Sequence, residues 1–129
     1  MVIKKTLKNF ADNTFDIAFT ISVLDHIGSK DEVVLTIKEL FRVSKKVYLF
    51  EPYIEGVDGD VSGLSRAEVK KGLPRPDKVF AKHSYLWNYY DICSKLNLEI
   101  KTKEIPLHAH SLGPFYNLFE INKILIKAD

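Results

Sequence analysis

Two titratable side chains, His26 and Glu51, lie at or just beyond the carboxyl ends of apolar runs that are typical of strands. The runs span 15–22 and 46–51, and Pro52 ends the second because proline cannot continue a strand ladder. In open α/β sheets, ligands bind at the carboxyl ends of such strands. His26 and Glu51 are therefore a candidate acid/base pair. The alternatives are a hydrogen-bonded structural carboxylate for Glu51 and a helix-start residue that orients the backbone for His26.

Other residues that can carry chemistry have less informative spacing. His108 and His110 are separated by one residue and would share a face of an extended segment, but a metal site needs at least one more ligand and none is evident. The glycines of 56–63 indicate a surface loop, with a phosphate cradle or metal loop as the alternative. Cys93 falls on an apolar helical stripe, which predicts a buried small side chain and not a nucleophile. No metal site is predicted.

Four segments have the patterns of strands, and together with the helices between them they predict an α/β fold. The first segment is rich in aromatic and β-branched residues without Gly or Pro, which predicts a strand buried on both faces. The third alternates apolar with polar residues, which predicts a half-exposed strand near a sheet edge. The predicted strands are 15–22, 46–51, 98–105 and 119–127.

Three helices are predicted from capping signals and from apolar residues at helical spacing. Ser29, with Glu32 three residues later, forms a capping box ahead of an apolar stripe that continues to Phe41. Asn97 can adopt the left-handed conformation that ends a helix. The predicted helices are 30–43 after Ser29, 66–71 after Ser65 and 85–96 after Ser84.

Composition and charge exclude several classes of protein. The 129 residues are 46% apolar and 28% charged, which suits one domain with a modest core. The net charge of +2 comes from 19 basic and 17 acidic residues, so nucleic-acid binding is not expected. No apolar run approaches the roughly 20 residues of a membrane span, and none resembles a signal peptide. A single cysteine suits a reducing compartment, and we expect a cytoplasmic protein.

The first strand and its surroundings also resemble a known family. Asp12-Asn-Thr-Phe-Asp16, the apolar run and Val23-Leu-Asp-His-Ile27 resemble the fourth-strand region of class I S-adenosylmethionine (SAM)-dependent methyltransferases. After a helix, Lys46-Val-Tyr-Leu-Phe-Glu-Pro52 resembles the family's fifth strand. The resemblance covers the second half of the family's domain. It implies a Rossmann-like half-sheet that is mostly parallel, with strands in the order first, second, fourth, third, an antiparallel last strand, and helices on its faces.

The same resemblance implies that part of the cofactor site must come from elsewhere. The family's Gly-rich turn and the acidic residue that holds the ribose precede the matching region, and this sequence contains neither. Lys4, Lys5 and Thr6 stand where an acidic residue often approaches the adenine. Strand 15–22 would then have an open apolar edge, which invites pairing with another chain. We expect a homo-oligomer or a separate SAM-binding chain as partner, and residues 1–129 as a single truncated domain.

Site residues follow from the resemblance. It implies that Ile21, Ser22, Val23, Leu24 and His26 flank SAM and that Glu51, Tyr53 and the segment 53–83 face the substrate. The region after the fifth strand often carries a substrate lid in the family, and the segment 53–83 would take that place. The lid residues that could line a small-molecule site are Tyr53, Arg75, His83 and Tyr85, each with an ordinary surface loop as the alternative.

Two functional classes remain open. One is a SAM-dependent methyltransferase, or the substrate-side half of one, in which the protein mainly orients the methyl acceptor and supplies a base. The other is a truncated, non-catalytic relative that acts as a scaffold or interaction subunit. The absent Gly-rich turn favours the second class, and the intact Val23–Ile27 segment favours the first.

Overall fold

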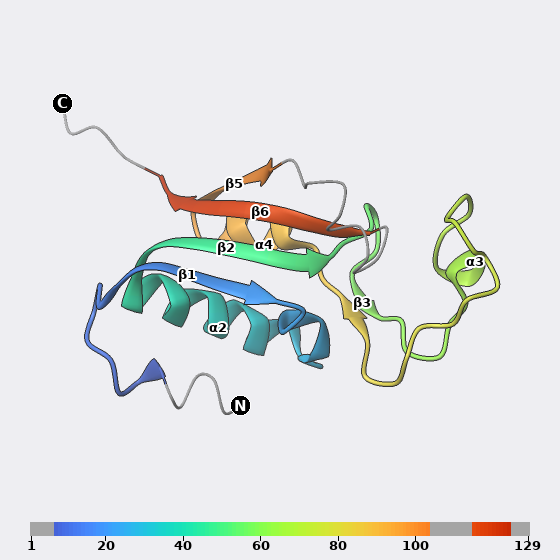
Figure 1. Cartoon of the computed structure of the whole chain (residues 1–129), viewed down its shortest axis with the longest axis horizontal. Helices are drawn as coiled ribbons and strands as arrows, with labels where there is room; N and C mark the ends of the chain where they lie inside the picture. The colour runs from blue at the N-terminus through green and yellow to red at the C-terminus, as the bar shows by residue number, and fades with distance from the viewer. Residues whose placement is uncertain (1–6, 104–114, 125–129) are drawn as a thin grey trace.

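The computed structural model describes residues 7–103 and 115–124 (Figure 1). The chain forms a mixed α/β fold with one four-stranded sheet and a second, two-stranded sheet. The elements are β1 (Phe15–Ile21), the 3₁₀ helix η1 (Leu24–His26), α2 (Lys30–Val43), β2 (Ser44–Pro52), β3 (Gly59–Asp60), α3 (Arg66–Val69), β4 (Tyr85–Leu86), α4 (Tyr89–Lys95), β5 (Leu98–Lys103) and β6 (Tyr116–Lys123).

The large sheet has the strand order β1-β2-β6-β5 (Figure 1). β1 pairs with β2 in parallel, and β6 runs antiparallel to both of its neighbours, β2 and β5. This is the order that the resemblance implied, including the antiparallel last strand. By pairing, however, the sheet is mixed and not mostly parallel, because two of its three strand pairs are antiparallel.

The main core lies on one face of this sheet. Alternate residues of β2 and β6, such as Val47 and Phe119, point toward α2 and α4 and are completely buried. Both helices contribute to the same cluster of buried side chains, through residues such as Ile37 and Ile92. The expectation of helices on both faces is therefore wrong for the described residues, since α2 and α4 cover the same one.

The prediction that strand 15–22 is buried on both faces is also wrong. Thr20 is buried on the helix side, but the side chains of Ile17, Phe19 and Ile21 are 54%, 67% and 52% exposed. They pair in register with Lys46, Tyr48 and Phe50 on the face that no described helix covers. Within the described residues β1 has only β2 as a neighbour, so one edge of this apolar strand is open, as predicted.

The helix predicted over 30–43 has its predicted bounds, the one over 66–71 ends early at Val69, and the third differs at its start. Helix α2 begins after Ser29, whose hydroxyl accepts a hydrogen bond from the backbone N–H of Glu32. The short helix α3 has the complete capping box of Ser65 and Glu68. The helix predicted over 85–96 instead starts at Tyr89, because residues 85–86 form β4 and Asn88 provides the cap.

The end of α4 follows the prediction. Asn97 has a φ of 55° and terminates the helix in the left-handed conformation. Cys93 is completely buried in the core, as its place on the apolar stripe predicted.

Residues 53–88 form an excursion that leaves the large sheet at the carboxyl end of β2 and carries α3 away from it (Figure 1). The two short strands β3 and β4 close its base by antiparallel pairing. Ile54, Val61 and Leu86 form a small core of their own. None of the described helices has the length and apolar character needed to cross a membrane.

Candidate functional site

The Glu51 carboxylate organises the turn after β1. Glu51 is completely buried, and its two oxygens accept hydrogen bonds from one hydroxyl and three backbone N–H groups. The donors are Thr20 Oγ1 at 2.8 Å, Val23 N at 3.0 Å, Leu24 N at 2.9 Å and Asp25 N at 3.2 Å. The carboxylate thus satisfies the N–H groups at the start of η1, which is the structural role that the sequence left open for it.

Opposing effects act on the pKa of this carboxyl group. Burial raises the pKa of Glu51 to about 7 from its ordinary value of 4.5, and the nearby Asp25 carboxylate adds to the rise. The hydrogen bonds from Val23 and Thr20 oppose the rise, because they favour the charged form.

Ser22 makes the turn between β1 and η1. Its φ of 52° is unusual for a residue with a side chain, and such conformations are found where surrounding contacts hold the backbone. Its backbone N–H donates to the Phe50 carbonyl at 3.0 Å. Its hydroxyl donates to the Asp25 carboxylate, at 3.2 and 3.1 Å from the two oxygens, and lies 2.7 Å from the Tyr116 hydroxyl. These contacts join the ends of β1, η1 and β6.

His26 lies at the rim of this turn and not against Glu51. Its side chain is 59% exposed, with Nε2 3.6 Å from the Asp25 carboxylate and Nδ1 3.2 Å from the His83 carbonyl oxygen. The described contacts of His26 are therefore with Asp25 and His83. The two residues predicted as an acid/base pair therefore have different positions: Glu51 is buried inside the turn, and His26 lies on its outer surface.

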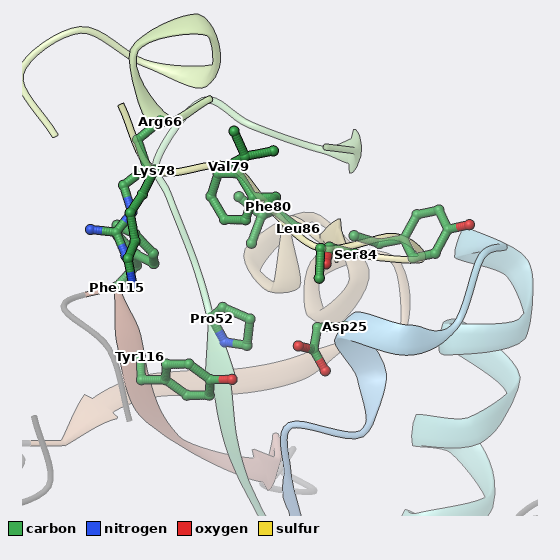
Figure 2. Close-up of a pocket in the computed structure, with 12 residues that line it drawn as sticks. Asp25, Pro52, Arg66, Lys78, Val79, Phe80, Ser84, Leu86, Phe115 and Tyr116 are labelled. Carbon is green, nitrogen blue, oxygen red and sulfur yellow. The ribbon is translucent and has the colours of Figure 1, made fainter. Parts of the chain in front are cut away.

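A half-open pocket of about 250 Å³ lies between this turn and the 53–88 excursion (Figure 2). Asp25, at η1, is on one side, and Arg66 and Lys78, from the excursion, are on the other (Figure 2). The remaining lining residues are Pro52, Val79, Phe80, Ala81, Ser84, Tyr85, Leu86, Phe115 and Tyr116.

The two cations of the pocket are held differently. The Arg66 guanidinium donates to the Pro74 carbonyl at 2.9 Å and stacks over the Phe115 ring, 4.6 Å from its centre. The Lys78 side chain is exposed and forms no hydrogen bond or ion pair with a described residue. The pocket therefore presents one positioned and one unengaged positive charge.

The predicted substrate residues are divided among several places. Tyr85 lines the pocket, where its ring stacks on Trp87, and its hydroxyl lies 2.9 Å from the position that a Cβ at Gly28 would take. Tyr53 packs against Tyr90 and Phe119 at two shallower concavities on another part of the surface.

The other two predicted substrate residues are turn residues. Arg75 and His83 have φ values of 50° and 58°, and neither lines the pocket. His108 and His110 lie outside the described residues.

Tyr85 is the one pocket residue that was predicted as a site residue from the sequence. Among those that were missed, Asp25, Arg66, Lys78 and Tyr116 carry groups that can bind a ligand. Asp25 could have been found, because it lies within the Val23–Ile27 segment that carries the family resemblance. The other three carry no local signal, since only the folded excursion and the start of β6 bring them to the turn.

At this turn a SAM-type cofactor would meet side chains more than free backbone N–H donors. Ile21 and His26 are exposed and Ser22 and Val23 are partly exposed, whereas Leu24 is completely buried and offers a ligand no surface. The N–H groups of Ser22, Val23 and Leu24 all donate within the protein. The four accessible residues could contact one side of such a cofactor. Other groups would have to contact the rest of its surface.

Comparison with known proteins adds no assignment: no family model matches the sequence, and no curated protein matches it significantly.

Proposed function

We propose that this chain is the substrate-side part of a SAM-dependent methyltransferase that acts on a small molecule. The observation that carries the proposal is the position of the pocket: it opens at the carboxyl ends of β1 and β2, beside the Val23–Ile27 turn, in a sheet ordered β1-β2-β6-β5. The Rossmann-like assignment of this sheet is part of the proposal. So is a second copy or a separate chain that supplies the rest of the cofactor site along the open edge of β1.

In this proposal each part of the site has a definite task. SAM supplies an activated methyl group. Ile21, Ser22, Val23 and His26 contact the cofactor side of the turn, and the walls of the excursion hold the acceptor and exclude water. Asp25, fixed by the Ser22 hydroxyl, accepts a hydrogen bond from the acceptor group. The proton that the acceptor loses passes to Asp25 or to the neighbouring, exposed imidazole of His26.

The test is a titration of SAM into the ¹⁵N-labelled chain, followed by amide chemical shifts. We expect weak, saturable shifts at millimolar SAM that are confined to residues 21–26, because this chain provides one side of the site. A His26→Ala variant should weaken the binding, whereas His83→Ala should not, since His83 meets the turn through its backbone carbonyl. Absence of shifts at 21–26 would contradict the proposal.

A second function, an interaction subunit without catalysis, is favoured by a different observation. The exposed apolar strip of β1 is unusual for a surface strand, and such strips mark surfaces that bind other chains. This function predicts association through β1 without SAM binding at 21–26, so the titration above separates the two.

A further inference from the structure

The pocket has opposite charges at its two ends. Arg66 and Lys78 lie together on one side, and the buried Asp25 carboxylate lies on the other (Figure 2). Arg66 and Lys78 form no ion pair within residues 7–103 and 115–124, so no described residue neutralises these cations. A ligand that fills the pocket meets both signs of charge at once.

The cationic end suits a carboxylate. Arg66 donates one hydrogen bond, from Nη1, to the Pro74 carbonyl, and its stacking on Phe115 fixes the plane of the guanidinium. Its Nε and Nη2 have no described partner, so they remain available for two parallel hydrogen bonds to a carboxylate. Lys78 adds a mobile point charge at the same end.

The opposite end suits a hydrogen-bond donor. The Asp25 carboxylate accepts bonds from Ser22, and an ionised carboxylate has further acceptor capacity. The Tyr116 hydroxyl points toward Asp25 (Figure 2) and shares the Ser22 hydroxyl. A ligand hydroxyl or amino group at this end would bind to Asp25.

The middle of the pocket is apolar and small. Val79, Phe80, Leu86 and Phe115 form its walls. Its volume of about 250 Å³ lies below the ~300–1,000 Å³ that is usual for pockets that hold drug-sized ligands. This size fits a molecule with one ring or a short branched chain.

We propose that the pocket binds a single-ring hydroxy acid or amino acid analogue, with its carboxylate at Arg66 and Lys78 and its hydroxyl or amino group at Asp25. Only the identity of the methyl acceptor rests on the proposed function. The acceptor would be the ligand group at Asp25, next to the turn that faces the cofactor. The binding site itself does not require methyl transfer.

The test uses three probes without SAM: 4-hydroxyphenylacetate, its neutral amide and phenylacetate, which lacks the hydroxyl. Each is titrated into the ¹⁵N-labelled chain. We expect the hydroxy acid to shift the amides of Asp25, Ser84 and Tyr116 and to bind about tenfold more tightly than either of the other probes, since one lost charge-assisted bond corresponds to about that factor.

Matched lysine variants test the cationic end. Lys78→Gln should reduce the affinity for the hydroxy acid several-fold and leave that for the amide unchanged. Lys82→Gln makes the same charge change at an exposed residue that does not line the pocket, and it should bind as the native chain does. Arg66→Gln should weaken the hydroxy acid most. Its backbone spectrum and that of Lys78→Gln establish that the excursion is folded.

Two results would overturn the inference: equal affinities for the acid and its amide, or equal losses in Lys78→Gln and Lys82→Gln. Because no SAM is present, such a result alongside SAM shifts at 21–26 would remove the substrate class and leave the methyltransferase proposal standing. Probe binding without SAM shifts at 21–26 would support the substrate class and remove the methyltransferase proposal.

Discussion

Ser22 and Tyr116 are 94 residues apart in the sequence, yet their hydroxyl oxygens are separated by 2.7 Å. The contact joins the turn after β1 to the first residue of β6 and, through Ser22, positions the Asp25 carboxylate at the pocket. A pair of hydroxyls thus couples the strand that carries the family resemblance to the strand that completes the sheet.

Removal of the Tyr116 hydroxyl should loosen this turn. Tyr116→Phe keeps the ring, which packs against Phe50, and loses one partly buried hydrogen bond. We expect the free energy of unfolding to fall by about 1 kcal/mol in a urea titration. Tyr48→Phe is the matched control, because its hydroxyl bond to Glu120 is long at 3.3 Å, and it should cost less. Equal losses in the two variants would contradict the role given to Tyr116.

A second tyrosine should respond in the opposite direction. The hydroxyl of Tyr89 is fully buried and has no hydrogen-bond partner among the described residues, and burial raises its pKa well above the ordinary value. Tyr89→Phe removes an unsatisfied polar group and keeps the ring contact with Phe119. We expect the variant to be as stable as the native chain or about 1 kcal/mol more stable. A loss comparable to that of Tyr116→Phe would mean that the hydroxyl is satisfied in solution.

The stability of the native chain should depend on pH through Glu51. Its pKa is about 7 in the folded chain, above the ordinary 4.5, so the folded state binds this proton more tightly than the unfolded state does. Stability should therefore fall as the pH rises from about 4.5 to 7, because the folded state must ionise a buried group. The total should be roughly 3 kcal/mol, at about 1.4 kcal/mol per unit of pKa shift.

Glu51→Gln removes this titration, and the decline between pH 4.5 and 7 should disappear in denaturation curves. Below pH 4.5 the stability should instead fall as the pH falls, since the Lys46 and Lys103 ammonium groups lower the pKa of Glu120 to about 2. The stabilisation from Glu120 is complete above its ordinary pKa of 4.5 and is lost as the pH falls toward 2. A native stability that rises steadily from pH 4.5 to 7 would contradict the raised pKa of Glu51.

Local signals in the sequence were sufficient for several elements. The Ser29 capping box and the apolar stripe after it predicted α2 over its full length of 30–43. Asn97 marked the end of α4 because few residue types adopt positive φ readily. These features depend on residues within one or two helical turns of each other, which a single sequence displays directly.

Features that depend on distant partners could not be predicted in the same way. The composition of strand 15–22 is that of a buried strand, and nothing within it distinguishes a covered face from an open one. The two-residue strands β3 and β4 are too short to show a period, and β4 replaced the expected first turn of α4. Arg66 and Lys78 became pocket residues only because the excursion folds back over the turn.

The open face of β1 leads to the last prediction, which concerns self-association. Ile17, Phe19 and Ile21 form an apolar row beside a strand edge that no described strand pairs with. Burying such side chains stabilises an interface by about 25 cal/mol per Å² of apolar surface. We expect the purified chain to sediment as a dimer or larger species at micromolar concentration, and Phe19→Lys to shift it to the monomer without loss of helical signal. Leu35→Lys, at an exposed apolar residue of α2, is the control and should leave the assembly intact. If the native chain is a stable monomer, or if both variants dissociate it alike, β1 is not the contact surface, and the groups that complete the proposed cofactor site must be sought elsewhere.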